Sequence, residues 1–95
     1  MYAKAYREFE SLSFRKMFYV YVLWSSKLQK RYVGYTTDYQ KRLAEHNSGK
    51  SPFTKSGMPW ELVYTEEYTT ESDARRREKF LKSGVGRKFL DSLLK

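Results

Sequence analysis

The chain has 95 residues, no cysteine and a formal net charge of +8 at pH 7. This length supports one domain with a single modest core, and the lack of cysteine excludes a disulfide framework and a thiolate zinc site. The longest apolar run, Phe18 to Trp24, is too short to span a bilayer. We therefore expect a cytoplasmic protein that does not insert into a membrane. The sequence does not set the oligomeric state, and a monomer is assumed.

The chain begins with a segment, residues 1–16, that we expect to be an appendage to a domain at residues 17–95. The segment carries Glu8 and Glu10 and lacks a continuous apolar stretch, so it is not expected to be a secretory signal. Four of its apolar residues have the spacing of a short amphipathic helix: Tyr2, Tyr6, Phe9 and Leu12. Met17 directly precedes the first strand and is a candidate translation start. Deletion of residues 1–16 should leave folding and activity intact.

Two short β-branched and aromatic runs follow, and they predict a hairpin. Residues 18–24 should form a strand with Val20 and Val22 on one side and Tyr21 on the other. After a polar loop, residues 31–35 should form its partner. Tyr21 and Tyr32 would then lie on neighbouring strands with their hydroxyls close together.

The rest of the chain predicts three helices and one further strand. Asp38 or Thr37 should cap a helix that ends at Asn47 before Ser48-Gly49. A basic loop at 50–59 leads to a predicted strand at 60–68, with Trp60, Leu62 and Tyr64 on one face. A helix at 71–82 should be capped by Thr70 and closed by Gly84. A last helix at 87–94 should pack four residues on the core: Phe89, Leu90, Leu93 and Leu94. The order is ββαβαα. We expect Phe53, Trp60, Tyr64 and Phe89 to be packing residues.

The positive charge lies mostly in the domain body. Residues 1–16 contribute +2, because Lys4, Arg7, Arg15 and Lys16 oppose Glu8 and Glu10, and the remaining +6 belongs to residues 17–95. Nine tyrosines and two tryptophans accompany this charge. Cations neutralise phosphates and aromatic faces stack on bases, so the composition suits a nucleic acid, although a merely soluble basic surface has the same composition.

Arg42 and His46 occupy positions i and i+4 of the first predicted helix and share a face. A guanidinium and an imidazole on one face can grip a phosphate and exchange a proton near neutral pH. The alternative is a solvated helix surface with a histidine near the helix C-terminus.

Glu78 shares a face of the next helix with Ala74 and Leu81, where an apolar residue would be expected. A half-buried carboxylate needs a partner, and a metal ion or an arginine would supply one. The alternative is a surface ion pair with Lys82 or Arg75.

Four basic residues are candidate phosphate contacts, with a solvated surface as the alternative: Lys50, Lys55, Arg75 and Arg76. Tyrosine has an unperturbed pKa near ~10, so Tyr21 or Tyr32 would act as a base only with help from a cation. One carboxylate cannot readily hold two divalent ions, which favours one-metal hydrolysis.

The segments YVY and YVG, followed by RLAEHNSGK and ARRREKFLK, resemble the GIY-YIG endonuclease domain, in particular its small stand-alone bacterial members. The match spans roughly residues 17–94. The resemblance implies an α/β (α+β) sandwich with a three-stranded antiparallel sheet flanked by helices.

The resemblance also implies roles for individual residues. Tyr21 and Tyr32 fall on the two motif tyrosines, and Gly34 falls on the glycine that lets a helix and the substrate approach. Three more residues match family positions. Arg42 matches the arginine that steadies the scissile phosphate, and Glu78 matches the carboxylate that holds one Mg²⁺ (or Mn²⁺). His46 matches a histidine found in part of the family. Tyr19 replaces a motif glycine, which is expected to reshape the strand edge.

The expected function is a divalent-metal-dependent endonuclease that acts on DNA in repair or in the processing of branched or damaged structures. One alternative is a non-catalytic nucleic-acid-binding module with the same fold. Another is a small basic domain whose partner is a protein.

Overall fold

The computed structural model describes residues 16–94, and residues 1–15, with the helix predicted there, lie outside the described part. The described chain runs through strand β2 (Phe18–Ser25), strand β3 (Lys30–Thr36), helix α2 (Tyr39–Asn47), the short 3₁₀ helix η1 (Lys55–Gly57), strand β4 (Trp60–Tyr68), helix α3 (Glu71–Lys82) and helix α4 (Gly84–Leu93). The predicted order ββαβαα is therefore confirmed.

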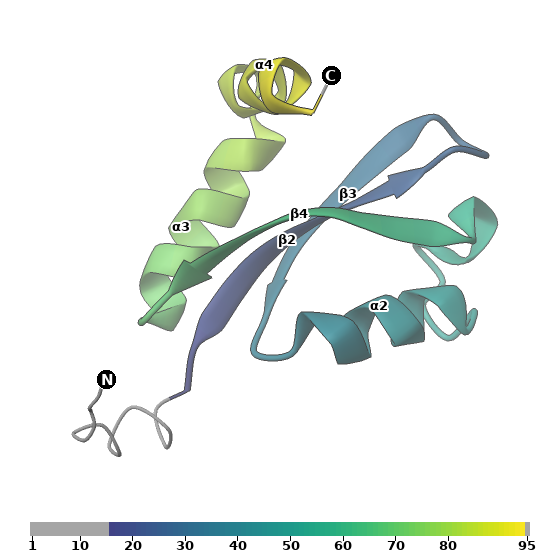
Figure 1. Ribbon diagram of the computed structural model, residues 1–95, viewed down its shortest axis with the longest axis horizontal. Coiled ribbons are helices and arrows are strands. Elements are labelled where there is room, and N and C mark those ends of the chain that lie inside the picture. The colour runs from purple at the N-terminus through teal and green to yellow at the C-terminus, as the bar shows by residue number, and fades with distance from the viewer. Residues whose placement is uncertain (1–15, 95) are drawn as a thin grey trace.

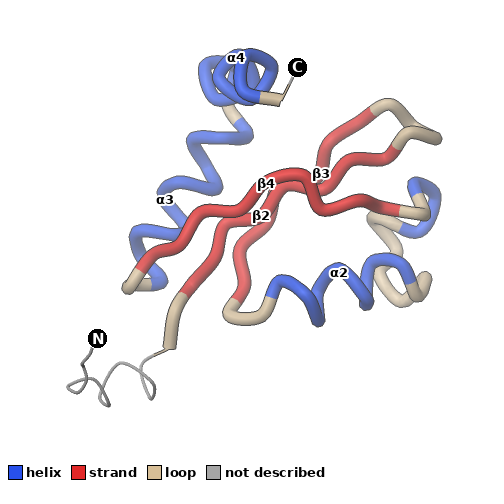
Figure 2. Tube along the Cα trace, in the orientation of Figure 1, coloured by secondary structure: helices blue, strands red, loops and turns tan. Residues whose placement is uncertain are grey.

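The three strands form one antiparallel sheet in the order β3-β2-β4, so β2 is the central strand and β3 is an open edge (Figure 2). Helix α2 lies on one face of this sheet, and α3 and α4 lie on the other (Figure 1). Within residues 16–94, no helix is long and apolar enough to cross a membrane.

Alternation along β2 gives each face of the sheet its own core, as predicted. Val20 and Val22 point toward α3 and pack with residues from three other elements: Val33, Ala74, Leu81 and Leu90. Tyr21 and Leu23 point toward α2 and pack with Trp60. Both faces of β2 are covered, which explains why Val20 to Leu23 are all buried.

The alternation of side chains along β4 is interrupted, so Trp60, Leu62 and Tyr64 do not share one face of the sheet. The prediction of a common face is wrong. Leu23 pairs with Leu62 but its neighbour Val22 pairs with Tyr64, so Val63 is an extra residue in the ladder. A β-bulge of this kind reverses the side-chain alternation beyond it. Trp60 and Leu62 consequently pack on the α2 side, whereas Tyr64 packs on the α3 side.

Local signals explain the helix ends. The side chain of Asp38 accepts a hydrogen bond from the backbone N–H of Lys41, and that of Thr70 accepts one from Asp73, so both predicted N-caps are confirmed. Gly49 follows α2 with φ at 81°, a left-handed conformation that glycine adopts without strain.

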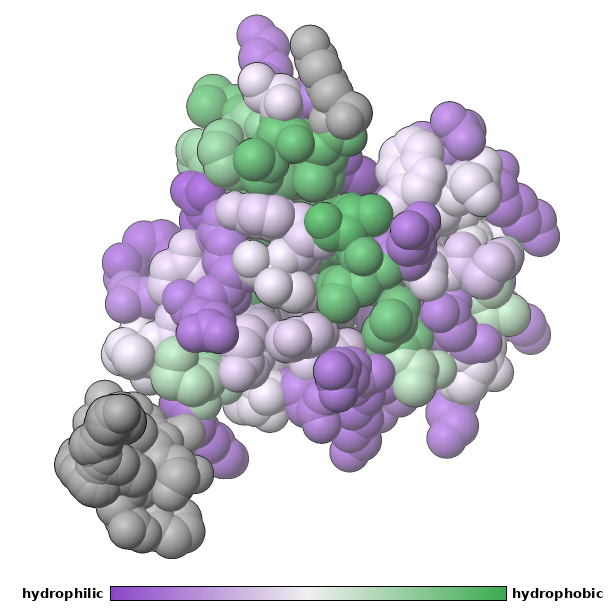
Figure 3. All heavy atoms as spheres, in the orientation of Figure 1, coloured by the Kyte–Doolittle hydropathy of each residue, from purple (hydrophilic) through white to green (hydrophobic). Residues whose placement is uncertain are grey.

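The C-terminal helix differs from the prediction. It begins at Gly84, with the Ser83 side chain as its N-cap, so Gly84 opens α4 and does not close α3. Leu90 and Leu94 pack on the core as expected, but Phe89 and Leu93 remain exposed, together with Val85. These three side chains give α4 an apolar outer surface, and green atoms gather over this helix in Figure 3.

Tyr19 leaves the strand intact, contrary to expectation. It pairs with Thr36 on one side and Glu67 on the other in an uninterrupted register, because β2 is the central strand and not an edge. The Tyr19 ring packs edge-to-face on Tyr39, the first residue of α2, at 5.1 Å between centroids. The aromatic side chain thus helps to seat α2 on the sheet.

Candidate active site

Tyr21 and Tyr32 lie together on the α2 face of the sheet, as the hairpin predicted. Tyr21 pairs with Gly34 across the ladder and Leu23 pairs with Tyr32, so both tyrosines face the same way. Their ring centroids are 6.3 Å apart. Tyr21 is 1 % exposed, while Tyr32 is half-buried.

Gly34 is required by Tyr21. A Cβ atom at Gly34 would lie 2.6 Å from the Tyr21 hydroxyl oxygen and 2.8 Å from the ring carbon that carries it. The glycine therefore makes room for the phenol of the neighbouring strand, a more specific role than the approach of a helix.

His46 is buried against both tyrosines, so the alternative of a solvated helix histidine is wrong. It is 1 % exposed, and its Nε2 lies 3.2 Å from the Tyr21 hydroxyl. Its Nδ1 lies 2.8 Å from Oγ1 of Thr54, and its ring centroid is 4.8 Å from that of Tyr32. Both ring nitrogens are thus hydrogen-bonded, which fixes the orientation of the imidazole.

The loop after α2 supplies residues that sequence reasoning missed. Thr54 is fully buried; its hydroxyl contacts His46, and its carbonyl accepts a hydrogen bond from the Trp60 indole at 2.7 Å. Asn47, the last residue of α2, accepts a hydrogen bond from the backbone N–H of Trp60 at 2.6 Å and donates one to its C=O at 2.9 Å. Thr54 lies in an irregular loop and Asn47 at a helix end, so no spacing signal indicates their contacts with His46 and Trp60.

Arg42 approaches this cluster from α2. Its side chain is 41 % exposed and its Nη1 donates to Glu45 at 2.7 Å. Burial raises the pKa of Tyr21, and the Arg42 guanidinium offsets this only in part. Burial also lowers the pKa of His46, and the positive charge of Arg42 lowers it further. At neutral pH the site therefore holds a neutral phenol beside a neutral imidazole.

Glu78 lies on α3, the helix that packs against β2 and β3. Its side chain is 20 % exposed and pairs with Lys82 at 2.8 Å, so the ion pair considered from the sequence is present. No cluster of three or more His, Asp or Glu side chains suited to a metal occurs within residues 16–94. A metal at Glu78 would therefore have one protein carboxylate. Mg²⁺ often accepts this arrangement, because it keeps several waters and binds substrate phosphates.

The predicted phosphate contacts lie in two places. Lys50 and Lys55 are exposed in the loop after α2, close in sequence to Thr54. Because successive helix residues turn by about 100°, Arg75 lies on the same side of α3 as Glu78, whereas Arg76 faces outward and pairs with Asp73. The fold thus favours Arg75 over Arg76 as a contact near the site.

Phe53 is not a packing residue, contrary to expectation. It is 88 % exposed, although its neighbour Thr54 is fully buried. Backbone hydrogen bonds from Thr54 and Lys55 to the carbonyl of Ser51 form the tight turn that turns the phenylalanine outward.

Arg77 is also placed differently from the exposed arginines before it. It forms a two-fold hydrogen bond with Glu66 of β4 at 2.9 and 3.0 Å, and its guanidinium lies over the Phe80 and Phe89 rings. Glu66 also accepts hydrogen bonds from Tyr64 and Tyr68. This network joins β4 to α3 and α4 on the face opposite α2.

Fold and site together define a nuclease-type domain of the kind that the two tyrosine motifs indicate. The model of the GIY-YIG catalytic domain matches residues 17–89. The chain belongs to the GIY-YIG family, and the resemblance inferred from the sequence is confirmed.

Several relatives are small UPF0213 proteins. One from Natronomonas pharaonis is 44 % identical over 66 residues, which cover 68 % of this chain and 76 % of the relative. YsiG of Lactococcus lactis is 39 % identical over 79 residues, covering 82 % of this chain and 75 % of the relative. The solution NMR structure of the UPF0213 protein BH0048 from Bacillus halodurans is similar in fold, with a TM-score of 0.51 and 35 % identity, covering 81 % of this chain and 84 % of that one.

Proposed function

We propose that the protein is a divalent-metal-dependent endonuclease that hydrolyses phosphodiester bonds in DNA, in the repair or processing of branched or damaged structures. The observation that carries this proposal is the buried hydrogen bond between Tyr21 and His46 in a GIY-YIG domain. Arg42 and Glu78 add the cation and the carboxylate that such a reaction needs.

The pair Tyr21 and His46 supplies a route for a proton. When Nδ1–H of His46 donates to Oγ1 of Thr54, the lone pair of Nε2 faces the Tyr21 hydroxyl and accepts its proton. An attacking water can then give a proton to Tyr21 while Tyr21 gives its own to His46. The raised pKa of Tyr21 makes this coupling necessary, because a phenol that stays protonated at neutral pH is a poor base alone.

Arg42 is suited to bind the scissile phosphate. Its one ion pair within residues 16–94 uses Nη1, which leaves the other guanidinium N–H groups for a phosphate oxygen. A fixed positive charge stabilises the pentavalent transition state, where negative charge on the phosphoryl oxygens increases.

Glu78 is the residue that would hold the metal. A bound divalent cation would supply Lewis-acid stabilisation to the phosphate and leaving oxygens. Glu78 has an oxygen beyond the one that contacts Lys82 at 2.8 Å, and it is accessible enough to exchange this partner for a cation.

The loop after α2 offers a contact for the nucleic acid beside the site. Phe53 projects into solvent between Lys50 and Lys55, and exposed aromatic rings flanked by cations stack on unpaired bases. The next residue, Thr54, contacts His46, so the loop that carries Phe53 is joined to the candidate site.

The test is to incubate the purified protein with nicked, branched, duplex and single-stranded DNA in the presence of Mg²⁺ or Mn²⁺. We expect metal-dependent cleavage of at least one structured substrate and inhibition by EDTA. Glu78→Ala should abolish cleavage while largely preserving binding. Cleavage that continues in EDTA would contradict the proposal.

The second candidate function is a nucleic-acid-binding module without catalysis. The ion pair between Glu78 and Lys82 favours it, since this pair occupies the proposed metal ligand. Tight DNA binding with no cleavage of any substrate, under either metal, would support this candidate over the nuclease.

A further inference from the structure

A groove of about 680 Å³ runs along the open edge of β3, where this strand faces the junction of α3 and α4. Its floor is closed by Val33, Leu81 and Leu90, which are buried members of the core, and Trp24 lies at one end. The floor thus offers no hydrogen-bonding side chain, and the polar character of the groove depends on its rim.

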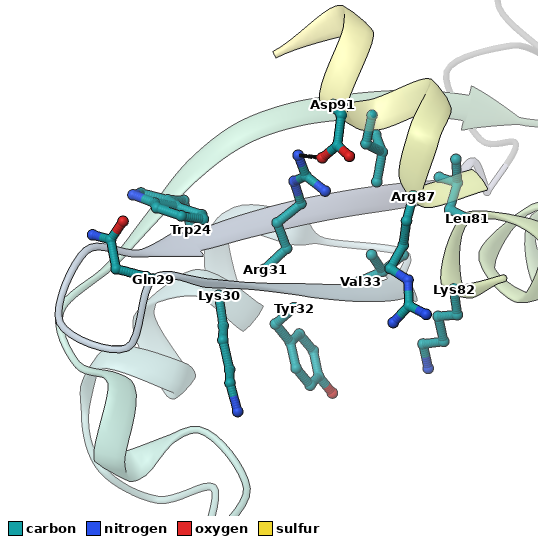
Figure 4. A pocket seen from close by; sticks show the side chains of 11 residues that line it. Trp24, Gln29, Lys30, Arg31, Tyr32, Val33, Leu81, Lys82, Arg87 and Asp91 are labelled. Carbon is teal, nitrogen blue, oxygen red and sulfur yellow. Dashed lines mark hydrogen bonds and ion pairs between the residues drawn. The ribbon is translucent and has the colours of Figure 1, made fainter. Parts of the chain in front are cut away.

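The rim is strongly basic. Lys30, Lys82 and Arg87 line the groove, and Figure 4 shows their side chains extending to the same side of β3 as Tyr32. Neither Lys30 nor Arg87 forms an ion pair with another residue of the 16–94 segment. The single carboxylate of the lining, Asp91, is already paired with Arg31 at 2.5 Å (Figure 4). Two cations from different elements therefore face one space without a neutralising partner.

The groove is continuous with the candidate active site. Tyr32, whose ring packs on His46, lines it, and so does Lys82, the partner of Glu78. An extended strand with one phosphate at Arg42 and Glu78 would therefore meet the groove as it continues along the edge of β3.

We propose that this groove binds the phosphodiester backbone of the substrate next to the scissile phosphate, with Lys30 and Arg87 as the phosphate-binding residues. The proposal rests on the proposed function. Lys30 from β3 and Arg87 from α4 are unpaired cations along one groove, and such cations can each neutralise a phosphate of a nucleic-acid strand. Lys82 adds a third charge when Glu78 exchanges it for a metal ion.

Binding to Lys30 and Arg87 should be visible in the salt dependence of affinity. Each phosphate neutralised contributes about 0.9 to the slope of log affinity against log salt for duplex DNA, and about 0.7 for a single strand. The double variant Lys30→Ala/Arg87→Ala should therefore lower the slope by about 1.4 to 1.8 and weaken binding by about 10-fold or more at moderate salt.

A matched control removes the same charge elsewhere. Arg76 and Lys79 are exposed on the outward side of α3, beside Glu71 and Ser72 and away from β3. The double variant Arg76→Ala/Lys79→Ala has the same net charge as the groove variant, and it should leave the salt slope nearly unchanged. Both variants change exposed side chains, and circular dichroism melting should give each the wild-type Tm.

The measurement is fluorescence anisotropy with labelled single-stranded and three-way-junction DNA, in EDTA so that no cleavage occurs, over a series of salt concentrations. Equal losses in the two double variants would overturn the proposal, since the effect would then be one of net charge. An unchanged slope in the groove variant would also overturn it.

The outcomes separate this inference from the proposed function. If the groove variant lowers the salt slope as predicted but the wild-type protein cuts no DNA, the result would support the groove and contradict the nuclease. Wild-type protein that cuts, with a groove variant of unchanged slope, would support the nuclease and contradict the groove. No binding of any DNA would overturn both.

Discussion

The phenol ring of Tyr21 lies directly against Gly34 on the neighbouring strand, at a distance that leaves no room for a side chain. This contact aims the Tyr21 hydroxyl at His46. The glycine of the second motif and the tyrosine of the first are therefore one structural unit, built across the ladder between β2 and β3.

Gly34→Ala should displace the Tyr21 ring, because a methyl group there would meet its hydroxyl oxygen at 2.6 Å. Overpacking of a core typically costs about 1–3 kcal/mol, so the free energy of unfolding should fall by that amount. Any nuclease activity should fall with it. Chemical denaturation measures the first effect and a cleavage assay the second.

Gly84→Ala is the matched control for this substitution. Gly84 opens α4, and apart from its chain neighbours and the backbone of its own helix no atom lies within 4 Å of the position that a Cβ would take. Stability should stay the same or rise slightly, since alanine is favoured over glycine in a helix by about 1 kcal/mol. A Gly34→Ala protein as stable and active as Gly84→Ala would contradict the account of the Tyr21 contact.

The buried His46 should make stability depend on pH. Burial lowers its pKa in the folded protein below the value near ~6.5 that it has when unfolded. Above pH ~6.5 both states are neutral there. As the pH falls below that value the unfolded chain binds the proton first, so the free energy of unfolding decreases by up to about 1.4 kcal/mol per pH unit until the folded pKa is reached.

The assignment to His46 can be checked because it is the single histidine of the chain. Urea denaturation at a series of pH values between 5 and 8 should show the decrease in wild type and a flat profile in His46→Gln. A slope of the same size in the variant would assign the effect to another group.

Lys82 should compete with a metal ion for Glu78, since its ammonium lies 2.8 Å from the carboxylate. Lys82→Met removes the competing charge, and the affinity for Mn²⁺ should rise a few-fold, as expected for about 1 kcal/mol of charge repulsion near a protein surface. Isothermal titration calorimetry on the free protein measures this without reference to activity. Lys79→Met, an equal change of charge on the outward side of α3, should bind Mn²⁺ like wild type, and Glu78→Gln should bind it weakly. A Lys82→Met affinity no different from that of Lys79→Met would contradict the competition.

Glu66 should matter for stability and not for chemistry. Its burial alone would raise the pKa of its carboxyl, but hydrogen bonds from Arg77, Tyr64 and Tyr68 outweigh this and hold the pKa below its usual value. Burial and the bond to Glu66 raise the pKa of Tyr68 to about 12. Glu66→Gln would leave the Arg77 charge without its partner and should cost about 2–4 kcal/mol in the free energy of unfolding.

Glu67→Gln is the control for Glu66→Gln, because Glu67 is the exposed neighbour on the same strand. It should change stability by less than about 0.5 kcal/mol. Since the lowered pKa of Glu66 means that its stabilisation is lost as the pH falls below about 4.5, the difference between the two variants should shrink in acid. A constant difference down to pH 3 would contradict the role of the carboxylate.

Much of the fold follows from local signals in the sequence. The alternation of Val20 and Tyr21 set the two faces of β2, and the side chains of Asp38 and Thr70 marked the starts of α2 and α3. The β-bulge at Val63 could not be predicted, because it depends on pairing with β2 and leaves no local pattern. The start of α4 at Gly84 was missed for a similar reason. A glycine after a helix usually signals an end, and here Ser83 caps a new helix at once.

The candidate site also contains residues that the sequence predicts and residues that only the tertiary fold places. Hairpin spacing predicted that Tyr21 lies near Tyr32, and helix spacing predicted that Arg42 and His46 share a face. The resemblance to the GIY-YIG family joined these two pairs into one candidate site. Thr54 lies in an irregular loop, and only the tertiary fold places its hydroxyl on His46. The exposure of Phe53 also depends on the turn at Ser51, which a composition argument cannot distinguish from a packed loop.

The most direct test of the central claim is the rate of cleavage of a labelled branched DNA by excess protein in Mg²⁺ or Mn²⁺, compared between wild type and Glu78→Gln. The account predicts that wild type cuts the DNA. The variant should bind the DNA equally well, but its cleavage rate should be lower by a factor of about 100 or more. Equal cleavage rates in the two proteins, or no cleavage by wild type on any substrate that it binds, would contradict the claim that these residues form a phosphodiester-hydrolysing site.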